Sequence, residues 1–453
     1  MKKIFAFMAI ATLMSSCCQS PEIESSVPAK MVNGTVVLET PARAEGQTSA
    51  LQMACEPIDT VRVGFVGLGG RGYSAVGRYL QVPGTKITAI CDKYPEKVSA
   101  AQEMLKENGF PKAAEYTGDE GYKQLCEDPN VDLVYICTPW LLHTPIAVYA
   151  MEHGKHAATE VPAATTIEEC WQLVNTCERT RKHCMMLENC CYDFFEMTCL
   201  NMAQQGVFGE IYHAEGAYLH NLDPFWPHYE DNWRLDFNQK HRGDNYPTHG
   251  LGPICQILDI HRGDKMDYLV AMDSDSYRGA ARGKEFMGTD EFEDGDHTVS
   301  LIRTHNGHQI EIQHNVYAPR PYSRIFQLTG TNGYACKYPE PVFAVEPDPE
   351  NFADKETFDA LCKLYEHPIS AEYEEKAKEV GGHGGMDYIM DCRLIHCLRN
   401  GLPLDEDVYD AAEWSCIAEL SRISIKNGSV PVQVPDFTRG DWNEIQGFHH
   451  SGF

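Results

Sequence analysis

The sequence VRVGFVGLGGRG, at residues 61–72, joins a β-branched run to a glycine pattern of the form G-x-G-x-x-G. An amphipathic segment follows at once, so the expected order is strand, glycine turn, helix. In such a turn Gly67 permits the tight bend, Gly69 lets the backbone approach a pyrophosphate, and Gly72 lets the helix pack closely on the strand. The N-terminus of the helix then faces the negative charge of the phosphates. The stretch therefore predicts a dinucleotide-binding turn.

A second apolar strand strengthens this prediction, because glycines alone also make ordinary loops. Residues 86–91 form the strand, and it ends at Asp92, twenty residues past Gly72. A carboxylate at this place accepts hydrogen bonds from the hydroxyls of the adenosine ribose and repels the 2′-phosphate of NADP. The glycine pattern, its place between a strand and a helix, and the acid at the end of the second strand together predict NAD as the cofactor.

Strand and helix patterns continue to alternate over the next hundred residues. Helices are expected at 96–108, 145–153 and 167–182, and strands at 131–137, 157–159 and 185–187. Repeated βα units imply a doubly wound parallel sheet whose ligand lies at the carboxyl ends of the strands. We therefore expect an NAD-binding Rossmann domain over residues 61–188.

The C-terminal half has a weaker pattern. The strands expected there are 210–217, 298–304, 309–315 and 323–329, and the helices are 386–398 and 411–425. This predicts a second α/β domain over residues 189–435, with a large open, mainly antiparallel sheet, and a C-terminal tail at 436–453. The run Gly381-Gly382-His383-Gly384-Gly385 has the composition of a mobile loop, which either approaches the substrate or only connects two elements.

The N-terminus has the pattern of an export signal. Lys2 and Lys3 form a basic start, residues 4–14 are an apolar segment too short to span a bilayer, and Cys17 follows small residues. This is typical of a bacterial lipoprotein signal over residues 1–17, and it predicts an exported, membrane-anchored lipoprotein of the periplasm or outer membrane. An ordinary secretory signal is the alternative. Residues 18–60 are rich in Ser, Pro, Glu and Thr, so we expect a flexible tether.

Composition narrows the class of function. The chain has 453 residues, too many for one compact core, and 38 basic against 66 acidic residues make a net charge of −28. Such a field repels a phosphate backbone and argues against nucleic acid as a partner. The 18 cysteines lack zinc-finger spacing, so most are expected as small buried residues and no structural metal is predicted. Disulfide pairing and the oligomeric state, including a homo-oligomer, stay open.

Four stretches of the chain resemble the Gfo/Idh/MocA oxidoreductase family. They are VGFVGLGGRG at 63–72, ICDKYPEK at 90–97, VYICTPWLLHTPIAVYAMEHGKHAATEVPAA at 134–164 and VFGEIYHAEG at 207–216. The resemblance implies a Rossmann domain followed by an α/β domain whose sheet covers the nicotinamide. The family's usual catalytic lysine lies in a Glu-Lys-Pro triplet, which here is Glu160-Val161-Pro162. Since valine cannot relay a proton, plain alcohol dehydrogenation is in doubt.

With the lysine lost, the chain is similar to one branch of that family, glycoside hydrolase family 109. YPTHGLGP at 246–253 is the most specific string of this resemblance, which spans residues 61 to about 435. It implies an NAD-dependent α-N-acetylgalactosaminidase acting on a glycan or glycoside. In the implied mechanism the bound NAD⁺ oxidises the sugar at C3, a base removes the acidified C2 proton, and the C1 glycoside leaves by elimination. Water then adds and the retained NADH reduces C3 again.

The resemblance also implies the site residues. Those expected to hold the cofactor are Gly67, Gly69, Gly70, Arg71, Gly72, Asp92, Trp140, Leu141, Leu142, His143, Glu160, Val161 and Asn189. Those expected to contact substrate are Tyr218, Arg234, Tyr246, Pro247, Thr248, His249 and Tyr322. Tyr246 and His249 are the acid/base candidates, with His228 in an aromatic loop as a third. Each has a plainer alternative: a core histidine, a packed aromatic ring, or an arginine paired with a surface carboxylate.

Two other functions remain open. One is a sugar or inositol dehydrogenase of the parent family, for which Val161 is the adverse feature. The other is a cofactor-stabilised binding protein without turnover, which the combination of Tyr, His and Arg disfavours. Turnover without added NAD separates the glycosidase from the dehydrogenase.

Overall fold

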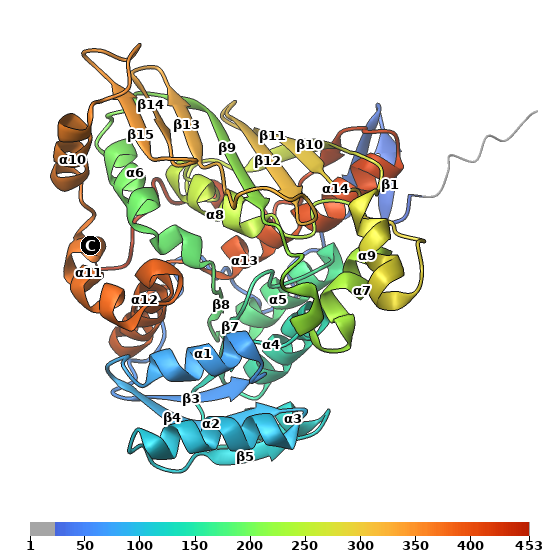
Figure 1. Cartoon of the computed structure of the whole chain (residues 1–453), viewed down its shortest axis with the longest axis vertical. Coiled ribbons are helices and arrows are strands. Elements are labelled where there is room, and N and C mark those ends of the chain that lie inside the picture. The colour runs from blue at the N-terminus through green and yellow to red at the C-terminus, as the bar shows by residue number, and fades with distance from the viewer. Residues whose placement is uncertain (1–22, 453) are drawn as a thin grey trace, which may run out of the picture.

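The computed structural model describes residues 23–452 and contains two α/β units with a cavity between them (Figure 1). The expected signal at residues 1–17 lies outside the described residues. Among the helices of residues 23–452, none combines the length and the apolar character that crossing a membrane requires.

The first unit is a parallel six-stranded sheet with the order β5-β4-β3-β6-β7-β8. Strand order reverses between β3 and β6, which is the point where doubly wound sheets bind their ligand. Every residue of β6 and β7 is buried, because helices cover both faces of these strands. The strands are β3 (Val61–Val66), β4 (Thr85–Asp92), β5 (Ala114–Thr117), β6 (Leu133–Ile136), β7 (His156–Thr159) and β8 (Cys184–Met186).

Helices alternate with these strands, which confirms the predicted Rossmann architecture. They are α1 (Gly70–Tyr79), α2 (Pro95–Glu107), α3 (Gly121–Glu127), α4 (His143–Glu152) and α5 (Ile167–Thr180). The N-cap residue Thr166 accepts a hydrogen bond from Glu169 N, which stabilises the start of α5. The short 3₁₀ turns η1 (Trp140–Leu142) and η2 (Asn189–Tyr192) follow β6 and β8 at the carboxyl edge of the sheet.

The second unit is built on a ten-stranded sheet with the order β1-β2-β16-β10-β11-β12-β9-β13-β14-β15. It is mainly antiparallel, as predicted, with parallel pairing only of β12 with β9 and of β16 with β2 among the described strands. The strands are β1 (Ala29–Val32), β2 (Thr35–Leu38), β9 (Ile211–Leu219), β10 (Met266–Asp273), β11 (Thr298–Thr304), β12 (Gln309–Asn315), β13 (Gln327–Gly330), β14 (Gly333–Cys336), β15 (Val342–Val345) and β16 (Val432–Gln433).

Helices lie on this sheet and between the two units, with α8 packed on β9 and α14 on β10. They are α6 (Phe194–Gln204), α7 (Trp233–Lys240), α8 (Thr248–Ile257), α9 (Arg278–Met287), α10 (Lys355–Leu364), α11 (Pro368–Val380), α12 (Met386–Asn400), α13 (Val408–Ser415) and α14 (Ile417–Lys426). The remaining 3₁₀ turns are η3 (Trp226–His228), η4 (Glu230–Asn232), η5 (His383–Gly385) and η6 (Asp441–Asn443). Figure 1 shows α12 beside α1, where Arg78 of α1 pairs with Asp391 of α12 at 2.9 Å.

The segment expected as a flexible tether is ordered where it is described, so that part of the prediction is wrong. β1 and β2 form a hairpin, and β2 joins the edge of the large sheet through β16. Arg43 then bonds Glu178 and Asp441, and Ala50 and Met53 are buried. The polar composition of this segment gave no indication of these contacts. The C-terminal tail is also packed, since Phe448 is buried.

Two further boundaries differ from the prediction. The strand expected at 323–329 starts only at Gln327, because Ile325 and Phe326 have positive φ, a conformation that no strand residue adopts. The helix expected at 411–425 begins earlier, at a capping box formed by Asp407 and Asp410, and divides into α13 and α14. All cysteines in residues 23–452 are free, and most are buried.

Candidate active site

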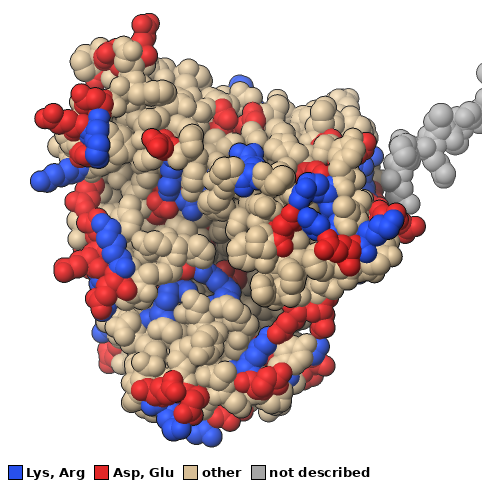
Figure 2. Space-filling view, viewed as in Figure 1, with Lys and Arg blue, Asp and Glu red and all other residues tan. Residues whose placement is uncertain are grey.

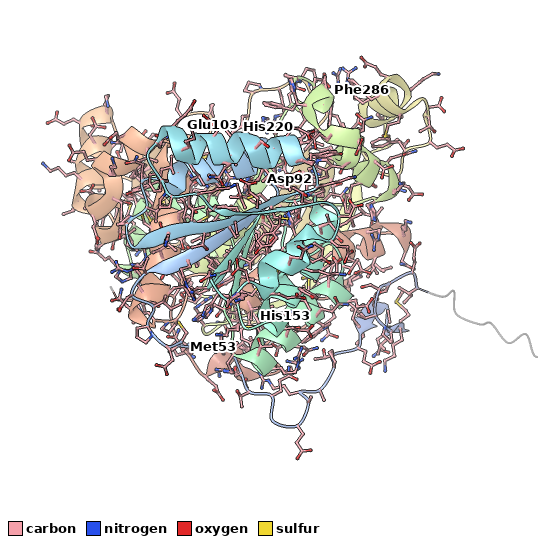
Figure 3. The ribbon with its side chains drawn as sticks, turned by 90° about the horizontal axis from the view of Figure 1, so that it is seen from below. Met53, Asp92, Glu103, His153, His220 and Phe286 are labelled. Carbon is pink, nitrogen blue, oxygen red and sulfur yellow. The ribbon has the colours of Figure 1, made fainter. Side chains whose placement is uncertain are left out.

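A cavity of about 920 Å³ lies where the carboxyl ends of the parallel strands face the second unit. Figure 2 shows a hollow in this region with Lys and Arg side chains at its edge. Asp92 of the first unit and His220 of the second both line the cavity, and Figure 3 shows them on the same side of the molecule. The cavity is large enough for a dinucleotide and a sugar together.

The glycine turn has the geometry that the sequence predicted. Gly67 has φ +88°, and a Cβ there would lie 2.7 Å from the Cys137 backbone. A Cβ on Gly72 would lie 1.8 Å from Gly67 O, so helix and strand could not approach. A Cβ on Gly70 would instead meet open space and one on Gly69 only Lys97 Nζ, at 3.9 Å, and no side chain caps the start of α1. The backbone N–H groups at this helix end are therefore available to an anionic ligand.

Asp92 is buried at the end of β4 and lines the cavity. Its Oδ2 accepts a hydrogen bond from Leu68 N at 2.6 Å, and its Oδ1 accepts one from Tyr94 N at 2.9 Å. The carboxylate thus braces the glycine turn and keeps further lone pairs for a ribose. These two backbone contacts were not part of the sequence argument.

The turn after β6 has a mixed role. Trp140 and Leu142 line the cavity, whereas Leu141 is 57% exposed and lies outside the lining. The ring nitrogens of His143 face backbone oxygens, Nδ1 that of Pro162 and Nε2 that of Thr138, each at 2.7 Å. Burial lowers the pKa of His143. His143 therefore joins the turns after β6 and β7, and its ring nitrogens are committed to the backbone.

Arg71 is the centre of a charged network beneath the cavity. Its guanidinium donates to Glu160 Oε1 at 2.6 Å and to Asp387 Oδ2 at 2.6 Å. Asp387 also accepts from Asn189 Nδ2 at 2.5 Å, so the network joins α1, the residue after β7, η2 and α12. Burial alone raises the pKa of Asp387, but the charge on Arg71 and the hydrogen bond from His383 hold it well below 3.8. Sequence analysis missed Asp387, which lies 316 residues from Arg71.

The glycine-rich run approaches the cavity rather than only connecting elements. Gly382 and His383 both line the cavity. His383 Nδ1 lies 2.9 Å from Asp387 Oδ2, and its side chain is 59% exposed. The composition of this run was the signal for it, although sequence analysis gave His383 no role.

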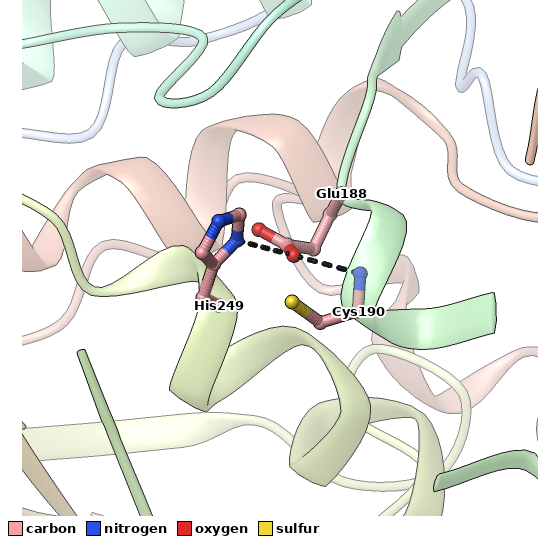
Figure 4. A group of neighbouring side chains, drawn as sticks. All are labelled: Glu188, Cys190 and His249. Carbon is pink, nitrogen blue, oxygen red and sulfur yellow. Dashed lines mark hydrogen bonds and ion pairs between the residues drawn. The ribbon is translucent and has the colours of Figure 1, made fainter. Parts of the chain in front are cut away.

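Tyr246 and His249 face the cavity from the start of α8, and a buried carboxylate supports the histidine (Figure 4). His249 Nδ1 lies 2.7 Å from Glu188 Oε1, and Nε2 lies 3.5 Å from the Tyr246 hydroxyl. Burial raises the pKa of Tyr246 well above 10, which favours its neutral form. Cys190 Sγ lies within 4.8 Å of ligand-type atoms of this pair. Sequence analysis missed Glu188, although it singled out its neighbour Asn189.

Arg234 lies among aromatic rings at the cavity wall. Its guanidinium carbon is 4.9 Å from the ring centres of Trp140 and Tyr246. Nη1 donates to the Tyr229 hydroxyl at 3.0 Å, while Nε and Nη2 are buried without a hydrogen-bond partner in residues 23–452. These two donors are available to an acceptor on a ligand. Arg234 does not form the surface ion pair that was its plainer alternative.

Tyr218 and His220 form the neighbouring part of the wall. The Tyr218 hydroxyl lies 2.9 Å from His220 Nδ1, and both residues line the cavity. Burial, with the charge on Arg234, lowers the pKa of His220 to about 4. His220 is therefore neutral at pH 7.

The other expected substrate residues occupy different places. His228 is exposed in η3 and lies at the rim of the cavity. Pro247 and Thr248 are buried at the start of α8, outside the cavity lining. Tyr322 is also outside the lining and contacts Tyr218 edge-on, with ring centres 6.2 Å apart.

Two family models together match most of the chain. Residues 61–188 match the oxidoreductase family with an NAD-binding Rossmann fold, and residues 192–444 match the C-terminal domain of glycosyl hydrolase 109. A glycosyl hydrolase family 109 protein of Porphyromonas gingivalis is 57% identical, over 93% of this chain and 94% of its own. Glycosyl hydrolase family 109 protein 1 of Bacteroides thetaiotaomicron is 54% identical, over 98% of this chain and 97% of its own.

Solved structures show the same fold at low identity. A levoglucosan dehydrogenase in complex with NADH and L-sorbose has a TM-score of 0.64 at 19% identity, covering 84% of this chain and all of its own. The WlbA dehydrogenase of Bordetella pertussis, in complex with NADH and UDP-GlcNAcA, has a TM-score of 0.57 at 17% identity. It covers 83% of this chain and 99% of its own.

The residues of this chain fit NAD as the cofactor. The open space at Gly70, the uncapped start of α1 and the buried Asp92 carboxylate suit a pyrophosphate and a ribose. The chain is thus an enzyme with an NAD-binding Rossmann domain and the second domain of a glycosidase family. At 54% and 57% identity over more than nine-tenths of its length, it belongs to glycosyl hydrolase family 109.

Proposed function

We propose that this protein is an NAD-dependent glycosidase that releases terminal α-linked N-acetylgalactosamine from a glycan or glycoside. The observation that carries the proposal is a single cavity in which the glycine turn and Asp92 face Tyr246, His249 and Arg234. Ordinary glycosidases need two carboxylates beside the scissile bond, whereas NAD-dependent ones are an exception. Val161 lines the same cavity and offers no group for proton transfer.

When bound, NAD supplies a reversible hydride acceptor for a sugar carbon. The protein must then move protons at the neighbouring carbon and at the leaving oxygen. His249 is the group that we assign to the C2 proton, because it lines the cavity and its Nδ1 is already bonded to Glu188. Tyr246, kept neutral by burial, and the two free donors of Arg234 orient the sugar. His383 also lines the cavity, with Nδ1 2.9 Å from Asp387 Oδ2, and suits the leaving oxygen.

Solvent deuterium tests this function. The protein as purified, without added NAD, should release nitrophenol from p-nitrophenyl α-N-acetylgalactosaminide. Product formed in D₂O should carry deuterium at C2, because His249 exchanges its proton with solvent before returning it. Mass spectrometry and proton NMR of the released sugar measure this incorporation.

A product that carries only hydrogen at C2, together with full activity after removal of NAD, would show conventional hydrolysis. Steady net production of NADH from the free sugar would instead show a dehydrogenase. The protein boiled in the same D₂O buffer controls for exchange without the enzyme.

Asp92→Asn is expected to weaken the retention of NAD. The exchange removes the charge that holds the ribose hydroxyls, and a hydrogen bond to a charged group contributes about 1.5–3 kcal/mol. The Kd for NAD should therefore rise by roughly 10- to 100-fold. NAD content after dialysis, measured by chromatography, checks the result.

Asp119→Asn is the matched control, because Asp119 lines the cavity but its side chain is 82% exposed. Equal NAD content in both variants would mean that the ribose is held by other groups.

A further inference from the structure

Glu188 is a buried carboxylate beside the cavity, and the mechanism described so far uses only its contact with His249. It lies two residues after the end of β8 and is not exposed to solvent. Its Oε1 lies 2.7 Å from His249 Nδ1 and accepts a hydrogen bond from Cys190 N at 3.1 Å. An acid with no solvent contact, aimed at a cavity histidine, needs an explanation because burying a charge is costly.

We propose that Glu188 is the positioning residue of His249. The carboxylate keeps the proton of the imidazole on Nδ1, so that the lone pair of Nε2 is on the side of the Tyr246 hydroxyl and the cavity. It also stabilises the imidazolium that forms when Nε2 takes a proton from substrate. The inference rests on the proposed function in one respect: it takes His249 as the base of that reaction.

Electrostatics support an ionised Glu188. Burial by itself raises the pKa of Glu188, but the charge of His249 and its hydrogen bond outweigh burial and hold that pKa below 4.5. Behind it, Glu406 Oε2 accepts a hydrogen bond from Glu188 N at 3.2 Å. Burial and the charge on Glu188 raise the pKa of Glu406 well above 4.5, which favours its neutral form. Only Glu188 of these two acids bears a negative charge toward His249.

Two glycines of the YPTHGLGP string bring the pair together. A Cβ on Gly252 would lie 2.9 Å from Glu188 Cγ, so only glycine lets α8 approach this carboxylate so closely. A Cβ on Gly250 would lie 2.3 Å from Ala217 N in β9. Helix α8 is therefore held tightly between β9 and η2, and His249 directly precedes the first of these two glycines. This packing fixes the imidazole relative to the carboxylate.

Several other ionisable groups face the pair and are part of any pH dependence. Tyr246, Tyr218 and Arg234 lie on the cavity side together with His220, and Glu406, Cys190, Cys191 and Asp410 lie behind. Burial raises the pKa of Tyr246, Tyr218, Cys190 and Cys191 above their ordinary values, so these four groups stay neutral near pH 7. Glu188 is then the negative charge in hydrogen-bond contact with the imidazole.

Glu188→Gln tests the proposal because glutamine keeps the shape and removes the charge. Turnover of the nitrophenyl glycoside should fall by roughly 10- to 100-fold, with KM little changed. The acid limb of the kcat profile should move to lower pH, because an imidazolium without its carboxylate loses its proton more readily. A side chain that only fills space would not move this limb.

Glu406→Gln is the matched control. Glu406 is a buried acid next to Glu188 that forms no hydrogen bond with His249, and burial favours its neutral form, so its amide should leave the acid limb in place. An unmoved limb in Glu188→Gln, or an equal shift in both variants, would overturn the proposal.

Nitrogen-15 NMR of the unmodified holoenzyme decides the question even where a variant fails to fold or no glycoside is turned over. With the His249 signals assigned by comparison with His249→Gln, Nδ1 should carry the proton and Nε2 should be bare at pH 8. A proton on Nε2 would overturn the role of Glu188. Absence of turnover would count against the proposed function alone, so the two failures are distinguishable.

Discussion

Replacing His249 with alanine is expected to lower kcat by roughly 10²- to 10⁴-fold while the bound NAD remains in place. His249 lines the cavity on the wall of the second domain, and its only charge-bearing hydrogen-bond partner in residues 23–452 is Glu188. The residues that fit the cofactor, the glycine turn and Asp92, lie on the other domain. The substitution therefore removes a proton-transfer group without removing a cofactor contact.

The measurement is steady-state release of nitrophenol together with the NAD content of the purified variant. His153→Ala is the matched control, because His153 is half-exposed at the end of α4 and its Nδ1 lies 2.8 Å from the Tyr149 backbone oxygen. Turnover should be unchanged in that variant. A His249→Ala enzyme that keeps most of its activity would assign the base to another group, with His383 first to be examined.

Asp387→Asn is expected to cost about 3 kcal/mol of folding stability, because it breaks a buried ion-pair hub. Asp387 is 1% exposed and bonds Arg71, Asn189 and His383. The substitution removes the negative charge of Asp387, so Arg71 retains its ion pair with Glu160 but loses the one with Asp387. The neighbouring Arg78 retains its ion pair with Asp391. Urea unfolding of the NAD-free protein, followed by circular dichroism, measures the change.

Asp359→Asn is the control for this second variant, since Asp359 forms an exposed pair with Lys355 on α10. That pair should contribute less than about 1 kcal/mol. The pKa of Asp387 is depressed in the folded protein, so its stabilisation is present above the unfolded pKa of about 3.9 and is lost as pH falls through the folded value. The variant should consequently lose less stability than the parent on acidification below about pH 4. Equal stability of Asp387→Asn and Asp359→Asn would show that the hub is not important for folding.

Local patterns in the sequence were sufficient for the Rossmann unit. The close approach of Gly72 to Gly67 O is a contact between residues five apart, so strand, glycine turn and helix could be predicted together. Asp92 followed from the spacing of the second strand, and the parallel sheet from the repeated βα pattern. Strands β11 and β12 were predicted with their observed bounds, because their alternation is local as well.

Tertiary structure alone decided which charged groups meet. Glu188 and His249 are 61 residues apart, and Arg71 and Asp387 are 316 apart, so no periodicity could pair them. The hairpin of β1 and β2 joined the large sheet through one strand near the C-terminus, where a polar composition had indicated a tether. The direction of each side chain in the WLLH stretch was likewise decided by the tertiary structure: Trp140 points into the cavity, whereas Leu141 is exposed to solvent. Local propensity determines elements and turns within a short span, whereas ion pairs and sheet edges depend on chain packing over long separations.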